Sequence, residues 1–478
     1  MTDRATTHPA PLAPSGAGER PLVNLTLVKY HIIASLVWFF VGLTGGFLFS
    51  MQFFRYYPFP GVELLSPGRV RMVHTNMMAY GFILNAYFAG MLWAIPRLTG
   101  FPILSDKLGK VFFWGWQVIL AFVVGGILTG HAQAVEWGET PIFTDPFIAL
   151  WALLGIVNLV APILKTRGRP LYVTLWYFTA SFVWTILNYL MGNYIPQFFV
   201  PGAGGAAVAG LFIHDLVGLF VTPIGWGLMY YFVPSILNRP IWSHALSLVG
   251  FWGLAFFYPL NGVHHFLYST IPMYVQYGAV TATVAVELVV TTVIVNFFMT
   301  LRGMGRTLVT SLPIRWFYTG MVAYFTTCLQ CAVQVQLPVQ QIIHFTDWVV
   351  AHAHLVMFAV FGSWIMGFFT ELWPRLVRRP WKSRALLEWH YWLTTLGIWL
   401  MFLTLTALGL QEGYLWRGLN PWEDMLRSAI PFWVFRTFTG LMIIAGTVVF
   451  AYHAWATARQ PAPAAVAERV EGAEPAAL

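Results

Sequence analysis

Two histidines, His352 and His354, stand one alanine apart in the apolar segment TDWVVAHAHLVMF, residues 346–358. On a β-strand they would share a face, whereas on an α-helix, at about 100° per residue, they would point about 200° apart. On a helix they could not bind one metal ion together, but each could bind a different group on its own side. Neutral imidazole is a common ligand of copper and of haem iron, so the surrounding chain decides the chemistry.

The thirteen histidines of the chain fall into two groups by position. Seven are expected in the polar N-terminal segment or near the ends of apolar segments, where the simplest interpretation is contact with solvent: His8, His31, His131, His244, His344, His390 and His453. The other six lie deep within apolar segments: His74, His214, His264, His265, His352 and His354. Polar side chains at membrane depth are costly, so these six are the candidates for function.

The spacing of the six histidines predicts three centres. His264 and His265 differ by about 100° on a helix, so both rings could reach one metal ion beside it, with His214 as a third ligand. Three nitrogens leave a coordination position open, which is typical of a catalytic metal. His354 would face His74, and such a pair suits a closed, electron-transferring haem, whereas His352 alone would leave a haem iron open to a small gas. Singly, each could instead be a hydrogen-bonded core residue.

The composition indicates a polytopic membrane protein. Of the 478 residues, 58% are hydrophobic and 9% charged, against about 25% charged in soluble domains. The net charge of +8 is carried mostly by cations in short loops between apolar runs, which does not resemble a nucleic-acid surface. The cysteines, Cys328 and Cys331, lie within an apolar run without a following histidine, so neither a disulfide nor a covalently attached haem is indicated.

Apolar runs of about 20 residues predict an all-α fold with twelve transmembrane helices. They centre on residues 28–53, 72–95, 111–130, 147–164, 172–192, 206–235, 244–266, 275–300, 313–337, 348–371, 388–410 and 432–455. Residues 23–458 would form this membrane domain, between a disordered N-terminal extension (1–22) and a disordered tail (459–478). Lys and Arg concentrate in the loops after even-numbered helices, so these loops and both termini are expected in the cytoplasm.

At this point the chain resembles a known family. The segments RMVHTNMMAYGFILNAYFAGM, IHDLVGLFVTPIGWGLMYYFVP, LSLVGFWGLAFFYPLNGVHH and TDWVVAHAH resemble the catalytic subunit (subunit I) of haem–copper oxygen reductases, in particular the cbb3-type cytochrome c oxidases. The resemblance covers all twelve expected helices and implies the subunit I fold in a bacterial-type inner membrane. It implies two haems, both b-type, and one copper ion. The low-spin haem would be bound by His74 and His354, the high-spin haem by His352, and copper by His214, His264 and His265.

The resemblance also implies roles for three residues near these centres. Tyr258, six residues before His264, matches the tyrosine that this branch links covalently to the copper histidine, here His214. Arg71 and Arg436 match partners of the haem propionates. Packed aromatic contact for Tyr258, and placement at the lipid–water interface for the two arginines, are the alternatives.

Two further sets of polar residues have matches in the family. Glu136 and Glu139 resemble glutamates beside a calcium ion that bridges the haem propionates, although a solvated acidic loop explains them equally well. Hydroxyl and amide groups on a proton path from the cytoplasm would come from Tyr230, Ser247, Asn296 and Tyr324. These groups could instead bond backbone carbonyls.

The implied function is a respiratory terminal oxidase that reduces O₂ to water, with electrons from a cytochrome c-type or copper-containing membrane-anchored partner and protons from the cytoplasm. Two departures keep a divergent nitric oxide reductase open: Gln330 replaces a glutamate of this branch, and Asp215 follows His214 where asparagine is usual. Known nitric oxide reductases lack Tyr258 and carry a glutamate one helical turn after the histidine, where this chain has Gly218. A transporter without haem is a remoter alternative, although no internal repeat supports it.

Overall fold

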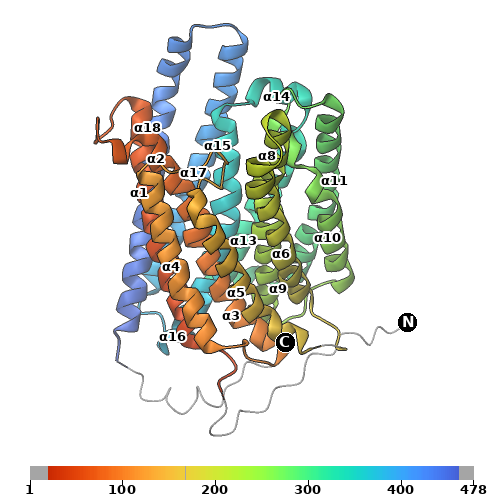
Figure 1. Cartoon of the computed structure of the whole chain (residues 1–478). Coiled ribbons are helices and arrows are strands. Elements are labelled where there is room, and N and C mark those ends of the chain that lie inside the picture. The colour runs from red at the N-terminus through yellow and green to blue at the C-terminus, as the bar shows by residue number, and fades with distance from the viewer. Residues whose placement is uncertain (1–19, 167, 462–478) are drawn as a thin grey trace.

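The computed structural model describes residues 20–166 and 168–461 of the chain. Within these ranges the protein is a bundle of roughly parallel and antiparallel helices without β-strands (Figure 1). The first described helix begins at Leu25 and the last ends at Ala458. The predicted disordered segments, 1–22 and 459–478, lie largely outside the described residues.

The bundle consists of long helices, several of which are continuous runs of α-helix and π-helix. In chain order these are α1 (Leu25–Met51), α2–η3–α3 (Pro67–Thr99), α4 (Asp106–Leu128), α5 (Asp145–Leu164), α6 (Val173–Tyr189), α8–η6–α9 (Gly202–Leu237), α10 (His244–Phe257), α11 (Met273–Thr300), α13 (Leu312–Gln334), α15–η9–α16 (Asp347–Val377), α17 (Arg384–Arg417) and α18 (Trp422–Ala458). Shorter elements join them, among them α7 (Ile195–Phe198), α12 (Gly305–Thr310) and α14 (Leu337–Ile343).

In the described part of the chain, ten helices are long and apolar enough to cross a membrane, rather than the predicted twelve. The segments predicted at 172–192 and 313–337 are helical but are not among the ten. The first of them, α6, continues through η5 (Leu190–Tyr194) into α7, so it is long enough to span, but polar residues such as Asn188, Asn193 and Gln197 lower its mean hydropathy. The second, α13, is 23 residues long but contains Gln330, Gln334 and several threonines, which lower its mean hydropathy.

Serine and asparagine caps explain where several helices begin. Asn24, Ser105, Ser243 and Ser383 each accept a hydrogen bond from the backbone N–H three residues later. An N-cap side chain satisfies one of the free N–H groups of the first turn and stabilises a helix by about 1 kcal/mol. All four caps lie at the same end of the bundle, because each begins a helix running in the same direction (Figure 1).

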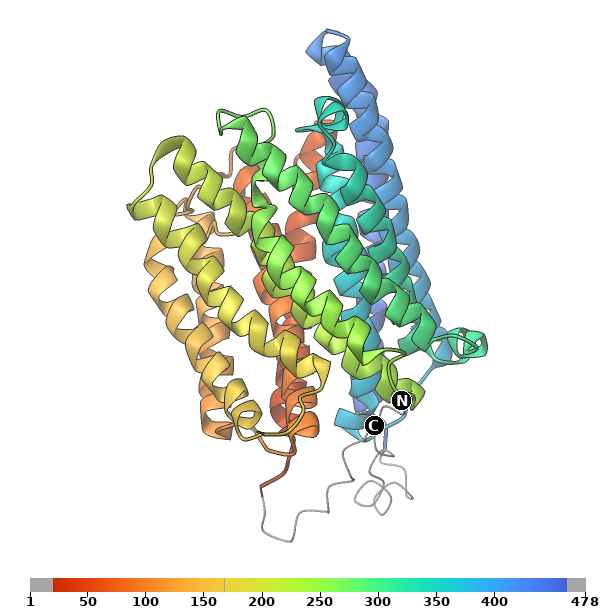
Figure 2. The same ribbon diagram turned by 90° about the vertical axis from the view of Figure 1, so that its right-hand side faces the viewer.

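The two ends of the bundle differ in charge and shape. The four-cap end carries the basic loops, and both ends of the described chain are held there, Arg20 by Asp106 at 2.7 Å and Gln460 by the side chain of Arg379. At the opposite end, the antiparallel pair α17 and α18 projects beyond the other helices (Figure 2). Both helices exceed their predicted ranges, 388–410 and 432–455, because the amphipathic residues of the hairpin tip continue the helices.

Three of the helical runs change to π-helix close to a candidate histidine. The π segments are η3 (Met77–Ile83), η6 (Leu216–Val221) and η9 (Leu355–Gly362). They begin three residues after His74, two after His214 and directly after His354. A π segment has more residues per turn than an α-helix. It therefore changes the direction in which the histidine before it points, relative to the α-helix that follows.

Candidate functional site

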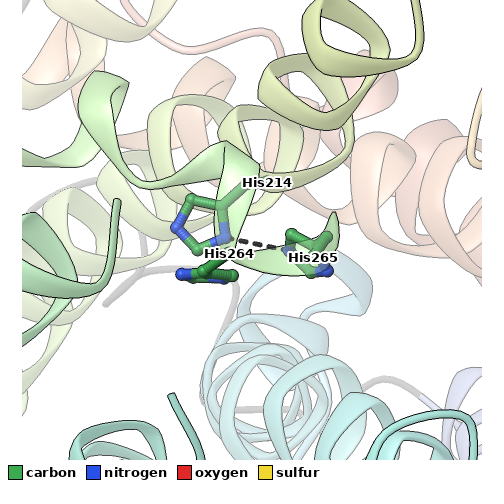
Figure 3. Close-up of side chains that lie close together, drawn as sticks. All are labelled: His214, His264 and His265. Carbon is green, nitrogen blue, oxygen red and sulfur yellow. Dashed lines mark hydrogen bonds between the residues drawn. The ribbon is translucent and has the colours of Figure 1, made fainter. Parts of the chain in front are cut away.

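Three candidate histidines converge on one point inside the bundle. His214 comes from the last turn of α8 (Gly202–Asp215), and His264 and His265 come from η8 (Gly262–Phe266). One ring nitrogen of each histidine lies within 4.8 Å of those of the other two, and Figure 3 shows the three rings gathered together. Nε2 of His214 is buried without a hydrogen-bond partner, and Nδ1 of His264 lies 2.7 Å from Oγ1 of Thr283 on α11. Nδ1 of His214 and Nε2 of His265 lie 3.2 Å apart, and three imidazoles gathered this closely suit a copper ion.

The vicinal pair does not lie on an α-helix, contrary to the prediction. The α10 helix ends at Phe257, and two 3₁₀ turns follow, η7 (Tyr258–Leu260) and η8. Pro259 explains the end of the helix because it has no backbone N–H for the next hydrogen bond. In a 3₁₀ turn, adjacent residues are about 120° apart. Both rings nevertheless reach His214.

His74 and His354 face each other from different helical runs. Their ring centres are 6.1 Å apart and their planes differ by 23°. Nδ1 of each ring lies 2.8 Å from a backbone carbonyl oxygen, of Gly42 and Val350 respectively. A carbonyl oxygen only accepts, so each Nδ1 carries the proton and each Nε2 keeps its lone pair. With metal–nitrogen bonds of about 2 Å, two imidazoles on opposite sides of one iron would have centres about 6 Å apart, so the pair fits a haem.

The surroundings of this pair are shaped for it. A Cβ at Gly46 on α1 would lie 2.6 Å from Nδ1 of His74, so only glycine leaves room for the ring there. Arg71 and Arg436 lie within electrostatic range of His74. Arg436 is 8% exposed, and its Nη1 lies 3.9 Å from Oδ1 of Asp347. Two cations beside the pair suit an anionic group such as a haem propionate.

His352 points toward α13, away from the direction of His354. Its Nδ1 lies 2.8 Å from Oε1 of Gln330, and its Nε2 lies 3.6 Å from Sγ of Cys331. The ring is within electrostatic range of His214, His264 and His265. The two histidines of one helix thus have different neighbours, and His352 lies on the side of the three-histidine cluster. The amide oxygen of Gln330 orients the ring, so Nε2 is the nitrogen that could bind a metal.

Tyr258 packs directly on the three-histidine cluster. Its ring stacks on that of His214, with centres 4.4 Å apart and planes 17° apart. The space comes from Gly218, one turn after His214, where a Cβ would overlap the Tyr258 ring. The aromatic ring therefore occupies the volume in which a side chain at position 218 would lie.

The two glutamates of the 129–141 loop lie in different environments. Glu139 is 3% exposed, accepts a hydrogen bond from Nδ2 of Asn76 at 2.9 Å and lies 3.7 Å from Arg71. Burial raises the pKa of Glu139 above its usual range, because the charged form is desolvated there. Glu136 is exposed. The loop therefore offers one buried and one solvated carboxylate.

The structure brings some of the predicted proton-path residues together. Nδ2 of Asn296 lies 3.4 Å from the Tyr230 hydroxyl, and the same amide also bonds the backbone of Ser243. The hydroxyl of Ser247 donates to the carbonyl of His244, as a residue without a transport role would. Tyr324 is 6% exposed and lies between Trp226 and Trp364.

Three histidines predicted to contact solvent are buried instead. His31, His390 and His453 are at most 1% exposed. Each sits near a helix end but is covered by a neighbouring helix; for example, Nδ1 of His390 lies 2.9 Å from the carbonyl oxygen of Gly446 on α18. By contrast, each of the six candidate histidines keeps an accessible edge. Position along the chain does not reveal this difference, because the covering helices are distant in sequence.

Glu287 is a polar residue beside the site that the sequence interpretation missed. It lies near the middle of α11, and one of its carboxylate oxygens is buried without a hydrogen-bond partner. The signal was present, since Glu287 is a charged residue in the apolar run VAVELVV.

Similarity to known proteins agrees with this fold. Residues 26–442 match the family model described as Cytochrome C and Quinol oxidase polypeptide I. The chain is 28% identical over 469 residues to a cytochrome c oxidase subunit 1 from Rhodobacter capsulatus, covering 93% of this chain and 87% of the relative. It is 27% identical over 456 residues to the cbb3-type cytochrome c oxidase subunit CcoN1 from Stutzerimonas stutzeri, covering 92% and 96%.

The fold is also that of a solved structure, a heme-copper terminal oxidase dimer determined by cryo-EM. The TM-score is 0.74 at 15% identity, covering 91% of this chain and 84% of that one. With the family match extending over most of the bundle, the chain belongs to the cytochrome c and quinol oxidase polypeptide I family, and it is a multi-pass membrane protein and the subunit I of a haem–copper oxidase.

Proposed function

We propose that this chain is the catalytic subunit of a respiratory terminal oxidase that reduces O₂ to water. The observation that carries the proposal is the packing of Tyr258 on His214, in the volume that Gly218 leaves open. A phenol at that place can release one electron and one proton to a substrate bound beside the histidines. Breaking the O–O bond needs such a donor, whereas joining two NO molecules does not.

The six histidines would hold the cofactors. His74 and His354 would bind a low-spin haem b, His352 a high-spin haem b, and the His214 cluster a copper ion. When bound, the iron and copper supply the O₂-binding position and the electrons. Arg71 and Arg436 would pair with haem propionates. Glu136 and Glu139 would bind calcium between those propionates, since carboxylate oxygens are the ligands that calcium prefers.

Electrons and protons would arrive from opposite sides of the membrane. A membrane-anchored cytochrome c or copper subunit would deliver electrons to the pair His74 and His354, and Ala353 alone separates the latter from His352 along the chain. Protons would come from the cytoplasm by way of Asn296, Tyr230, Ser247 and Tyr324. In this arrangement α6 and α13 also cross the membrane, giving twelve spans, with both termini in the cytoplasm of a bacterial-type cell.

A nitric oxide reductase is the second candidate. Two residues favour it because they depart from typical oxidases. Gln330 contacts His352, and Asp215, next to His214 in the chain, has both carboxylate oxygens buried without partners. Against it, position 218 cannot hold a glutamate while Tyr258 occupies the same volume. Family membership leaves no support for a transporter without haem.

The purified complex tests the choice directly. We expect two haems and one copper per chain by metal analysis, and O₂ uptake that exceeds anaerobic NO consumption. Tyr258→Phe removes the hydroxyl and should reduce O₂ turnover at least about 100-fold, the lower range for a lost proton-transfer group, with an unchanged haem spectrum. Tyr414→Phe on the exposed hairpin is the matched control. Absence of O₂ uptake by the wild type would overturn the proposal.

A further inference from the structure

A buried acid on α11 is unexplained by the site described above. Glu287 lies near the middle of Met273–Thr300, where a charged side chain is costly unless it has a partner or a function. One of its oxygens is buried without any hydrogen-bond partner. No basic side chain is paired with it among the ion pairs of the described residues. A structural role alone therefore leaves the carboxyl unaccounted for.

The position of Glu287 connects it to the catalytic residues. The α11 helix packs against α13, η7 and η8, which carry the residues around the cluster. One turn before Glu287, Thr283 contacts His264 at 2.7 Å, so this face of α11 is turned toward the site. The Glu287 carboxyl lies against the thiol of Cys328. Tyr258 and Tyr324 both lie within its electrostatic range.

The α13 helix connects the surroundings of Glu287 to His352. Cys331 is one turn beyond Cys328 and therefore on the same face. Its Sγ lies 3.6 Å from Nε2 of His352. Carboxyl and thiol groups thus extend from α11 to the side of His352, while Gln330 on α13, which contacts His352, cannot exchange a proton as a carboxyl can.

We propose that Glu287 is a proton-relay residue of the proposed oxidase, which stores a proton beside the site and delivers it to Tyr258. In this step the carboxylic acid O–H bond breaks and a phenol O–H bond forms on the Tyr258 phenolate, through the Cys328 thiol or a water molecule. The carboxylate is then reprotonated from the cytoplasmic side. No electron moves in the step. The inference rests on the proposed function, because the proton is delivered to the tyrosine that we assign to O₂ reduction.

The test uses the intact complex with Glu287→Gln, which keeps the size and polarity of the side chain but cannot release a proton. Glu287→Asp keeps the acid, and Glu423→Gln on the exposed first turn of α18 is the control. Proton uptake is followed with a pH-sensitive dye after the reduced complex is mixed with O₂. Infrared difference spectra between the reduced and oxidised states report the carbonyl band of a protonated carboxylic acid.

For Glu287→Gln we expect proton uptake to slow at least about tenfold, the carbonyl band to disappear and the haem spectrum to stay unchanged. Glu287→Asp should recover part of the rate and shift the band, and the control should match the wild type. Unchanged proton uptake in Glu287→Gln, or loss of the haem spectrum in both Glu287 variants, would overturn the relay.

These outcomes are separable from failure of the proposed function. If the wild type does not reduce O₂, the oxidase assignment fails, and the same variants are compared during NO reduction. Equal proton uptake by wild type and Glu287→Gln in that reaction would then overturn the role of Glu287 as well.

Discussion

At the scale of single residues, the partner of His352 is an amide where the cbb3-type pattern has a carboxylate. Gln330 accepts from Nδ1 of His352 at 2.8 Å and is neutral. A carboxylate at this position would pull the Nδ1 proton more strongly and make the imidazole a better electron donor to iron. Gln330 therefore tunes the haem that we assign to His352 toward a higher reduction potential.

We expect Gln330→Glu to lower that potential by about 40–65 mV. This range corresponds to the difference of about 1–1.5 kcal/mol between a neutral hydrogen bond and one to a charged group, at about 59 mV per 1.4 kcal/mol for one electron. A spectroscopic redox titration of the purified complex measures the shift. Gln336→Glu, at an exposed position of the same region, should leave both haem potentials in place, and an unmoved potential in Gln330→Glu would contradict the assignment.

The buried carboxyl of Glu139 should make the thermal stability of the complex depend on calcium and on pH. Burial raises its pKa, so ionisation costs stability as the pH rises through that pKa, unless a cation is bound. Calcium should therefore raise the thermal midpoint of the complex, and this effect should weaken as the pH falls and Glu139 becomes protonated.

Glu139→Gln should remove most of the calcium response, measured as the midpoint shift between calcium-loaded and chelator-treated samples. Glu63→Gln, whose side chain is 83% exposed, is the control. An equal calcium response in Glu139→Gln and in the wild type would exclude this site.

At the scale of elements, the π segments decide where the histidines point. The α16 helix (Ser363–Val377), which follows η9, is fixed by packing against α13. The backbone geometry of η9 therefore determines how the short helix α15 (Asp347–His354), with His352 and His354, is rotated relative to α16. Removing one residue from η9 would change the relative direction of the two parts by about 100°.

Deletion of Ala359 in η9 should therefore abolish binding of both haems, because His352 and His354 would leave their partners. The visible spectrum of the purified chain measures this. Deletion of Leu419, 91% exposed at the tip of the α17–α18 hairpin, is the control and should keep the spectrum. A deletion of Ala359 that retained both haem bands would show that η9 does not set the direction of these histidines.

The elements also show which part of the structure could be predicted from the sequence. Hydropathy placed α1 within three residues, 28–53 against Leu25–Met51, because burial in lipid demands a continuous apolar run. The π segments could not be predicted, since hydropathy does not report backbone hydrogen bonding. The end of α10 before the 3₁₀ turns of His264 and His265 does have a signal in the sequence, because Pro259 cannot donate the next helical hydrogen bond.

At the scale of the whole molecule, the four serine and asparagine caps and the loops richest in Lys and Arg lie at one end, and the α17–α18 hairpin lies at the other (Figure 2). The basic end should be cytoplasmic, because positively charged loops resist translocation. The projecting hairpin would then stand on the outer side, the side of Arg71, Arg436 and Glu139, where an electron donor would dock.

Accessibility labelling tests this orientation. A cysteine introduced as Ser269→Cys, in the exposed loop before α11, should react with a membrane-impermeant reagent in intact cells. Thr310→Cys, in the exposed basic region before α13, should react only after the cells are broken. The wild type controls for Cys328 and Cys331. The reverse pattern would invert the topology.

The shared volume of Tyr258 and Gly218 also restricts how this protein can evolve. A descendant that acquired a carboxylate at position 218 would have to lose the aromatic ring first, since the two cannot coexist. The intermediate with neither group would have a hollow beside His214 and neither activity in full. Exchanging the phenol for a carboxylate in this chain therefore takes two ordered substitutions, and a variant with small residues at both positions is the necessary intermediate.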